Sequence, residues 1–281
     1  MSLSNDLRTY CIIGDPIDHS LSPAMHNAAF KMLKVNCTYI AFRIGKDELE
    51  AGLASLRKIN IAGFNVTMPH KVTIIPLLDE LDETCIKIGA VNTVNNENGK
   101  FKGYNTDIHG FIEPIKRRKI DLKNKTVLLI GSGGAARAAI TALMDESVGK
   151  IVIANRNVEK SQVLNDICKR QNIYTELVIL EDSSKYASNA DLIVNATPIG
   201  MKGEDSILKA EHINSDCVVY DLVYRPMQTG LIRSANEAGA TVIYGYEMLL
   251  EQGIKSFEIW KQMKAPSDIM KKTIAEDFIY K

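Results

Sequence analysis

The sequence predicts an α/β protein of two domains, the second of which is built on a doubly wound sheet. A chain of 281 residues with 46% hydrophobic residues exceeds the size at which a single core is the default. Apolar segments that end in Gly, Asn or Asp alternate with stretches of helical periodicity, which is typical of βαβ units. A glycine-rich turn follows the apolar segment at 126–130 and leads into a helical pattern, as the first turn of a doubly wound sheet does.

In the first part of the chain, apolar segments at 9–14, 37–44 and 61–68 predict strands. Helical spacing predicts helices at 23–33 and 47–58 between them, and a third helix after His70. Together these elements predict an N-terminal α/β domain around a parallel sheet.

A polar and basic segment at 108–124 separates these elements from the rest of the chain, and we predict the domain boundary there. After Gly245 the apolar residues again have helical spacing, so this segment can return to the first domain. We therefore predict a first domain of residues 1–109, completed by helices in 246–281, and a second domain of residues 110–245. In the second domain, strands are predicted at 126–130, 150–154, 176–180, 191–195, 217–222 and 241–244, with helices at 135–144, 157–170 and 229–238.

The composition favours a small-molecule partner. Lys+Arg and Asp+Glu are balanced at 34 each, so no net charge draws the chain to nucleic acid or to an anionic membrane. No apolar run reaches the ~18 residues that span a bilayer, and the first residues lack the layout of a secretory signal, so we expect a soluble cytoplasmic protein. The five cysteines are far apart and the five histidines lack ligand spacing, so we expect neither disulfides nor a metal site.

The segment GSGGAA at 131–136 fits the dinucleotide fingerprint G-x-G-x-x-G/A. Gly131 permits the tight turn, Gly133 lets the backbone approach a pyrophosphate, and Ala136 lets the helix lie close to the strand. The N–H groups at the start of the helix would bind the anion. The segment therefore predicts a Rossmann-type dinucleotide site.

The end of the second strand of this domain predicts which dinucleotide binds. NAD-binding sheets usually carry an acidic residue there, which binds the ribose 2′-hydroxyl, whereas this chain has Asn155 and Arg156. A guanidinium group contacts a 2′-phosphate through charge-assisted hydrogen bonds, and Lys160 would add a second positive charge. We therefore expect NADP(H), with ordinary solvated surface residues as the alternative interpretation.

Three clusters of small polar residues follow strand-like segments of the first domain: HSLSP at 19–23, NVTMPHK at 65–71, and NT at 92–93 together with NTD at 105–107. Because ligands of open α/β sheets bind beyond the carboxyl ends of strands, these loops can converge on one site. Hydroxyl and amide groups suit a polyhydroxylated ring with a carboxylate. Each cluster taken singly is also explained by helix capping.

Seven blocks of the chain together carry a family resemblance. They are G-x-P-x-x-H-S-x-S-P at 14–23, N-V-T-x-P-x-K at 65–71, G-A-V-N-T at 89–93, G-Y-N-T-D at 103–107, N-A-T-P-I-G-M at 195–201, D-L-V-Y-x-P-x-x-T at 221–229 and G-x-x-M-L-L-x-Q at 245–252. In these residues and in this order, the chain resembles the shikimate dehydrogenase family. The resemblance implies an NADP-dependent oxidoreductase that interconverts 3-dehydroshikimate and shikimate, a step of aromatic amino-acid (chorismate) biosynthesis.

The resemblance also implies roles for individual residues. The catalytic pair would be Lys71 and Asp107. Substrate-binding residues would be Ser20 and Ser22 at the carboxylate, together with Asn65, Thr67, Lys71, Asn92, Asp107, Gln252 and, where the family closes its site, Tyr224. Cofactor-binding residues would be Gly131, Ser132, Gly133, Gly134, Ala135, Asn155, Arg156, Lys160, Thr197, Val223, Gly245 and Met248.

The chemistry of the implied pair is consistent with this reaction. Negative charge develops on the carbonyl oxygen when hydride reaches the carbon, and the ammonium group of Lys71 can stabilise that charge and donate a proton. We expect Asp107 to keep Lys71 charged and oriented rather than to act as an independent acid. The alternative is an ordinary surface ion pair, which contributes little to stability.

Three positions depart from the commonest family pattern or point to a variant of it. Asn157 replaces a threonine, which removes one possible phosphate contact, and Glu247 stands where glycine or proline is common. Tyr39 lies in a Tyr-x-Ala-Phe stretch that also occurs in relatives accepting quinate. The alternatives are therefore a quinate/shikimate dehydrogenase with mixed NAD and NADP use, and a non-catalytic dinucleotide-binding regulator. The sequence leaves a homodimer open.

Overall fold

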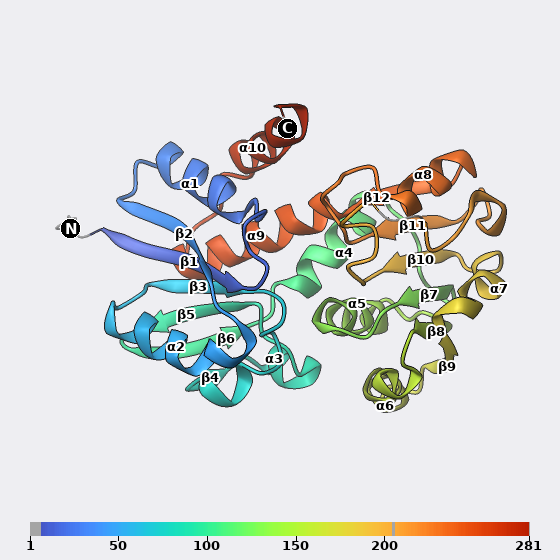
Figure 1. Cartoon of the computed structure of the whole chain (residues 1–281), viewed down its shortest axis with the longest axis horizontal. Helices are drawn as coiled ribbons and strands as arrows, with labels where there is room; N and C mark the ends of the chain where they lie inside the picture. The colour runs from blue at the N-terminus through green and yellow to red at the C-terminus, as the bar shows by residue number, and fades with distance from the viewer. Residues whose placement is uncertain (1–6, 204–205, 281) are drawn as a thin grey trace. The chain divides into compact units, whose positions relative to one another are not determined.

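A computed structural model describes residues 7–203 and 206–280 of the chain (Figure 1). The chain divides into two compact units. The first contains Met1–Asp107 and Leu250–Lys281, and the second contains Ile108–Leu249. The boundaries thus fall at 107/108 and 249/250, where the sequence predicted 109/110 and 245/246. Within the described ranges, no helix is long and apolar enough to cross a membrane.

The sheet of the first unit is mixed, so the prediction of a parallel sheet was wrong. β1 pairs in parallel with β2 and β3, but β5 is antiparallel to both β3 and β6. The strand order is β2-β1-β3-β5-β6-β4. The strands are Arg8–Gly14 (β1), Cys37–Arg43 (β2), Gly63–Val66 (β3), Glu80–Leu81 (β4), Thr93–Glu97 (β5) and Lys100–Tyr104 (β6).

The turn between β5 and β6 explains the antiparallel pair. Asn98 and Gly99 connect the two strands, and their φ angles are 56° and 91°. Two consecutive positive φ angles are what a two-residue hairpin turn needs, and Asn-Gly is its strongest sequence signal. The sequence analysis missed this hairpin because it assigned no element to the segment between 93 and 105.

Helices of the first unit bury apolar residues at helical spacing. Leu49, Leu53 and Leu56 are buried, and they pack into a core with Phe64 and Phe101 of the sheet.

The predicted helix after His70 was wrong: residues 71–74 form turns, and Ile75–Leu77 is a single 3-10 turn. Pro76 lacks a backbone N–H, which disfavours an α-helix here. The helices are Ser22–Met32 (α1), Leu49–Lys58 (α2), Glu83–Ile88 (α3) and Ser267–Tyr280 (α10), together with the later part of Gly245–Lys261 (α9).

The sheet of the second unit is parallel throughout and has the order β12-β11-β10-β7-β8-β9, which confirms the doubly wound fold. Its strands are Thr126–Ile130 (β7), Lys150–Asn155 (β8), Tyr174–Ile179 (β9), Leu192–Asn195 (β10), Val218–Asp221 (β11) and Thr241–Tyr244 (β12). Its helices include Gly134–Asp145 (α5), Gln162–Lys169 (α6), Ser183–Ala187 (α7) and Gly230–Glu237 (α8).

Residues 108–117 of the segment predicted as a boundary belong to a helix, Asp107–Arg117 (α4), which has Pro114 within it. Phe111, Ile112 and Ile115 are buried in the core of the second unit, so the segment has an apolar face despite its basic composition. Asp107 is the first residue of this helix and is assigned to the first unit. The helix start therefore fixes the backbone of Asp107.

Candidate functional site

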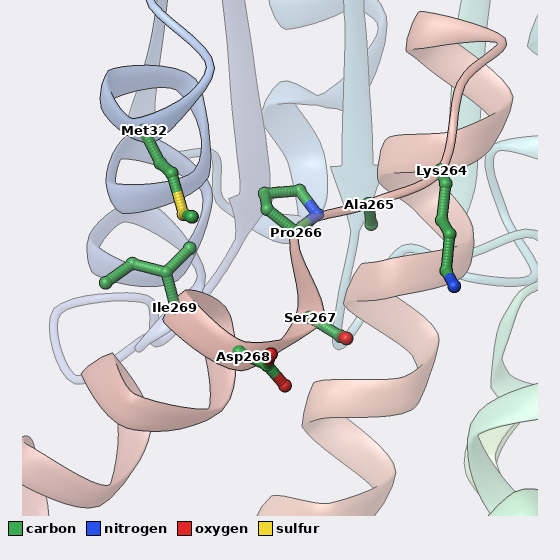
Figure 2. Close-up of a pocket in the computed structure, with 7 residues that line it drawn as sticks. All are labelled: Met32, Lys264, Ala265, Pro266, Ser267, Asp268 and Ile269. Carbon is green, nitrogen blue, oxygen red and sulfur yellow. The ribbon is translucent and has the colours of Figure 1, made fainter.

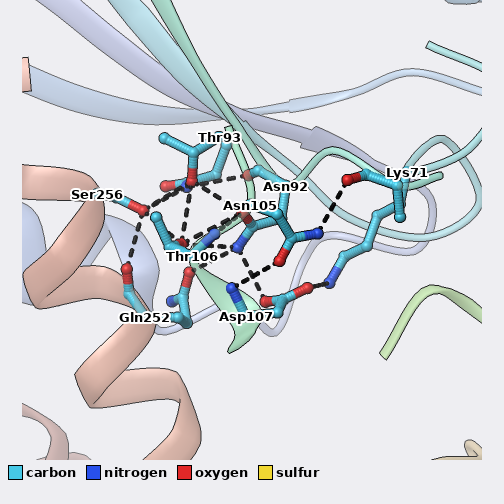
Figure 3. A network of polar contacts seen from close by, with 10 residues as sticks. Lys71, Asn92, Thr93, Asn105, Thr106, Asp107, Gln252 and Ser256 are labelled. Carbon is cyan, nitrogen blue, oxygen red and sulfur yellow. Dashed lines mark hydrogen bonds and ion pairs between the residues drawn. The ribbon is translucent and has the colours of Figure 1, made fainter. Parts of the chain in front are cut away.

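Lys71 and Asp107 form an ion pair in the first unit (Figure 3). Lys71 Nζ lies 2.5 Å from Asp107 Oδ2, and the two side chains are 18% and 5% exposed. Lys71 comes from the loop after β3, and its carbonyl accepts a hydrogen bond from Val91 N at 2.7 Å. The pair is far more buried than an ordinary surface ion pair, so solvent screens it less.

Asn92 fixes the orientation of the Asp107 carboxylate. The backbone N–H of Thr106 donates to Asn92 Oδ1 at 2.7 Å, and an N–H cannot accept. This contact assigns the two ends of the amide, so Nδ2 is the atom that donates to Asp107 Oδ1 at 2.8 Å. Both carboxylate oxygens of Asp107 therefore have a defined partner.

Three hydroxyl groups extend the network beyond this pair. The sequence analysis included Thr93 and Thr106 in its polar clusters without giving them a role, and it missed Ser256. Thr93 Oγ1 lies 2.8 Å from Ser256 Oγ and 3.1 Å from Thr106 Oγ1, and the latter two oxygens lie 3.1 Å apart. We call Thr93, Thr106 and Ser256 the hydroxyl cluster. The only sequence signal for Ser256 was its place one helical turn after Gln252, whose carbonyl accepts its hydroxyl proton at 2.9 Å.

Asn65 belongs to the same network. Its Nδ2 contacts Asn92 O, Thr93 Oγ1 and Ser256 Oγ at 3.0 to 3.1 Å. Its Oδ1 accepts the hydroxyl proton of Tyr39 at 2.7 Å. The amide is thus engaged within the protein at both ends.

Tyr39 rests on a buried aromatic layer. The ring of His26 stacks on it with centroids 4.6 Å apart, and both residues are at most 1% exposed. Burial lowers the pKa of His26 to about 3, so the imidazole is neutral at physiological pH. Burial likewise raises the pKa of Tyr39 well above its usual value, which keeps its hydroxyl protonated for Asn65.

Other predicted substrate residues come from the carboxyl ends of the neighbouring strands β1 and β3. Ser22 begins α1, and its N–H donates to Ser20 Oγ at 3.3 Å. Thr67 packs so closely that a Cβ on Gly14 would lie 2.4 Å from its Cγ2, which is why position 14 needs glycine.

The last two predicted substrate residues come from other parts of the chain. Gln252, in α9, reaches the network, since its Oε1 lies 3.4 Å from Asn92 Nδ2. Tyr224 belongs to the second unit, in the loop after β11.

The glycine turn of the second unit has the form that an anion needs. Gly131 has φ +108°, and a Cβ there would lie 2.8 Å from Thr197 Cγ2. Gly133 directly precedes α5 and provides no side-chain cap, and a Cβ at this position would meet no atom within 4 Å. Open space beside uncapped N–H groups fits the pyrophosphate of a dinucleotide.

The end of β8 presents two cations. Asn155 Nδ2 donates to Ser132 Oγ at 2.6 Å, which ties the end of this strand to the glycine turn. Arg156 and Lys160 are exposed, and their side chains form no hydrogen bond or ion pair with any described residue. They are therefore available to a phosphate group.

The loops after β10 and β11 are linked by a buried carboxylate that the sequence analysis missed. Asp221 is 0% exposed and accepts from Asn195 Nδ2, Val223 N and Thr229 Oγ1 at 2.9, 3.0 and 2.6 Å. Burial raises its pKa to about 6, although the three hydrogen bonds oppose this rise. The signal that could have found it is a lone aspartate at the end of an apolar strand.

The start of α9 is set by a second ion pair. A Cβ on Gly245 would lie 2.6 Å from Leu222 O, so only glycine allows this approach. Glu247 binds Arg118 through two contacts of 2.7 and 2.9 Å, and its Oε1 accepts from Tyr244 N at 3.2 Å. The acidic residue that departs from the family pattern is thus paired, and it holds the first turn of the helix that carries Met248.

A pocket in the first unit lies elsewhere (Figure 2). It is lined by Met32 and residues 264–269, and none of the predicted site residues takes part. Within residues 7–203 and 206–280, no three His, Cys, Asp or Glu side chains are grouped as metal ligands. The candidate catalytic residues lie in the polar network of Figure 3, and the candidate dinucleotide site is the turn at Gly131.

Comparison with known proteins identifies the family. Residues 12–94 match the shikimate dehydrogenase substrate binding domain, residues 114–218 match shikimate / quinate 5-dehydrogenase, and residues 245–275 match the shikimate 5′-dehydrogenase C-terminal domain. The chain is 49% identical over 271 residues to a shikimate dehydrogenase (NADP(+)) of Nitrosopumilus maritimus, covering 96% of this chain and 99% of that protein.

Solved structures agree. A shikimate dehydrogenase in complex with NADP+ is 38% identical, with a TM-score of 0.89 and coverage of 97% of this chain and 96% of that one. Shikimate 5-dehydrogenase of Thermus thermophilus, in complex with NADP(H) and shikimate, is 32% identical with a TM-score of 0.85, over 96% and 99% of the two chains. The chain therefore belongs to the shikimate dehydrogenase family.

Proposed function

We propose that this protein is an NADP-dependent oxidoreductase that reversibly reduces 3-dehydroshikimate to shikimate, a step of chorismate and aromatic amino-acid biosynthesis. The observation that carries the proposal is the partly buried ion pair of Lys71 and Asp107, in which the amide of Asn92 also binds the carboxylate. The relatives named above act as NADP(+) shikimate dehydrogenases, and the chain aligns with them over nearly its whole length.

Lys71 would act on the reacting oxygen. Bound NADPH would supply the hydride that reduces the C3 carbonyl carbon. The ammonium group of Lys71 would stabilise the negative charge on the oxygen and donate the proton that forms the hydroxyl group. In the reverse direction the neutral amine would take up this proton.

Asp107 would hold Lys71 in position during this step. One oxygen of its carboxylate contacts Lys71 Nζ and the other accepts from Asn92, so the carboxylate has no freedom to turn away. A group held by two hydrogen bonds before substrate arrives needs no reorganisation in the transition state.

The remaining polar residues of the first unit would bind the substrate. Ser20 and Ser22 would contact the carboxylate. The ring hydroxyl groups would contact Thr67, Asn92, Asp107 and Gln252. For Asn65 we propose a supporting part as well, because its amide already binds Tyr39 and the hydroxyl cluster. The role of Tyr224 in closing the site stays a prediction.

The second unit would bind NADP(H). The glycine turn would hold the pyrophosphate at the start of α5, and Arg156 and Lys160 would bind the 2′-phosphate. The other proposed contacts are Ser132, Gly134, Ala135, Asn155, Thr197, Val223, Gly245 and Met248. On this proposal the first unit is the substrate-binding domain and the second is the NADP-binding domain.

Two alternatives from the sequence are not favoured. Relatives that are 41 to 49% identical to this chain are named shikimate dehydrogenase (NADP(+)), whereas a quinate dehydrogenase in complex with NAD is 28% identical, so the quinate/shikimate enzyme with mixed cofactor use ranks second. A non-catalytic regulator has no use for a lysine paired with a buried carboxylate that an amide holds in place. A homodimer and a cytoplasmic location stay predictions.

An assay of two substrates with two cofactors tests the proposal. We expect shikimate with NADP+ to give a kcat/KM at least about tenfold above the other three combinations of shikimate or quinate with NAD+ or NADP+, which is a difference of about 1.4 kcal/mol in transition-state binding. Equal or greater activity on quinate would favour the second candidate. No turnover of either substrate would refute both.

A further inference from the structure

Asp221 is a buried carboxylate to which no role has been given above. It lies at the carboxyl end of β11, is 0% exposed, and forms no ion pair with any described residue. Burying a carboxylate without a positive partner is costly, even with hydrogen bonds. A buried charge of this kind calls for an explanation that packing alone does not give.

Two of the hydrogen-bond donors to Asp221 lie where the loops after β10 and β11 begin. Asn195 is its register partner on β10, and Asn195 Oδ1 in turn accepts from the backbone N–H and the hydroxyl group of Thr197 at 3.1 and 2.7 Å. On its other side, Asp221 Oδ1 accepts from Val223 N at 3.0 Å. One carboxylate oxygen thus connects directly to Val223 and, through one amide, to Thr197.

This network also reaches the glycine turn. Thr197 Cγ2 lies where it would contact a Cβ on Gly131, so the turn and the Thr197 loop are packed together. Thr229 caps α8 by accepting from Ile232 N, and it donates its hydroxyl proton to Asp221 Oδ2 at 2.6 Å. Asp221 therefore accepts hydrogen bonds from three segments that meet at the carboxyl ends of the parallel strands.

We propose that Asp221 is a positioning residue for NADP(H), whose ionised carboxylate holds the loops after β10 and β11 so that Thr197 and Val223 contact the cofactor. This inference rests on the proposed function only in taking those two residues as cofactor contacts. It adds a residue that binds no ligand itself and acts through the loops it anchors.

An ionised carboxylate is the form that this arrangement needs. All three of its partners donate hydrogen bonds, and a carboxylate accepts at both oxygens. A neutral acid carries a hydrogen on one oxygen, and an amide has an NH2 group in place of one. The groups that face it are the amide of Asn195 on β10 and the hydroxyl group of Thr229 at α8. On β12 its register partner is Tyr244. The amide of Asn195 and the hydroxyl group of Thr229 carry no charge.

The substitution Asp221→Asn tests the proposal, with Asp191→Asn as its matched control. Asp191 precedes the other end of β10 and also accepts from a backbone N–H, that of Thr126 at 2.8 Å, but it is more exposed and lies far along the strand from the loops. We expect Asp221→Asn to raise the Kd for NADPH about tenfold at pH 8, as loss of a charged acceptor does, and Asp191→Asn to leave it unchanged.

Two further readouts separate positioning from a general loss of structure. The KM for shikimate should rise much less than the Kd for NADPH, because all of the proposed substrate residues except Tyr224 belong to the other unit. Thr229→Ser should keep the wild-type Kd for NADPH, because it retains the hydroxyl donor, whereas Thr229→Val should raise it.

The pH dependence gives a second test. Burial raises the pKa of Asp221 to about 6, so the wild-type carboxylate becomes neutral below that pH and resembles the variant. The 2′-phosphate of NADPH titrates in the same range, so the quantity to follow is the ratio of the variant Kd to the wild-type Kd. We expect this ratio to fall from about ten at pH 8 toward one at pH 5.

The outcomes are distinct. A ratio near one at pH 8, with the variant folded by circular dichroism, would overturn the inference. A rise in the shikimate KM as large as that in the NADPH Kd would also overturn it. Because NADPH binding is titrated by fluorescence without turnover, a wild-type protein that binds NADPH but does not oxidise shikimate would refute the proposed function alone.

Discussion

The ammonium group of Lys71 lies 2.5 Å from Oδ2 of Asp107, whose side chain is only 5% exposed. The other oxygen of the same carboxylate accepts from Asn92. Asp107 is therefore held from both sides, and Lys71 meets a negative charge whose direction is set by the protein. This relationship leads to the first prediction.

Asp107→Asn should lower kcat by about tenfold or more while leaving the Kd for NADPH unchanged. The amide keeps the size of the side chain but removes the charge that holds Lys71, and an interaction lost in the transition state lowers kcat. Steady-state kinetics and a fluorescence titration with NADPH measure the two quantities. Asp79→Asn is the control, since Asp79 also pairs with a cation, Arg57 at 2.8 Å, in the same unit. Equal kcat values for the two variants would contradict the role of Asp107.

Ser256→Ala should destabilise the protein by about 1 to 2 kcal/mol, because Asn65 and Thr93 each lose a buried partner. Ser55→Ala is a close control. Ser55 likewise donates to the carbonyl four residues earlier in its helix, that of Ala51, but it is exposed. Its loss should cost less than about 0.5 kcal/mol. Urea denaturation measures both, and equal losses would show that the hydroxyl cluster contributes nothing beyond the helix bond.

Arg156→Ala should raise the KM for NADPH about tenfold and leave the KM for NADH nearly unchanged, since only NADPH carries a 2′-phosphate for the guanidinium group. Arg170→Ala is the control, because Arg170 is also an exposed arginine of the second unit, at the end of α6. If the KM for NADPH does not respond to Arg156→Ala, the phosphate lies elsewhere.

Asp221 should make the protein less stable as the pH rises. Burial raises its pKa from 3.8 to about 6, so the folded state binds the proton more tightly than the unfolded state does. The free energy of unfolding therefore falls between about pH 4 and pH 6, by on the order of 3 kcal/mol for this group. Asp221→Asn lacks this titration, so its stability relative to wild type should increase over that range in urea denaturation. A constant difference from pH 4 to pH 8 would contradict the assigned burial of charge.

The sequence predicted the fold class and the dinucleotide turn because both depend on local patterns. β7 and β12 have the predicted bounds, since each is a short apolar run between clear turns. The two failures in the first unit were also local. Asn98-Gly99 was overlooked as a hairpin turn, and Pro76 was given too little weight against a helix.

The network around the Lys71–Asp107 pair could not be predicted in the same way. Asn65 and Ser256 are 191 residues apart in the chain, and no periodicity brings them together. Asp221 was hidden for a different reason. A polar residue at the end of an apolar strand usually marks the start of a turn, and only the packed structure reveals that it is fully buried.

The most direct test of the account is the rate of NADPH oxidation by Lys71→Ala in a single turnover with 3-dehydroshikimate. The exposed Lys100, which pairs loosely with Glu80 in the same unit, provides the control variant Lys100→Ala. The account predicts a rate reduced by about 100-fold or more in Lys71→Ala, the scale of a lost proton donor, with NADPH still bound as tightly as in wild type. A rate in Lys71→Ala within a few-fold of the control would contradict it.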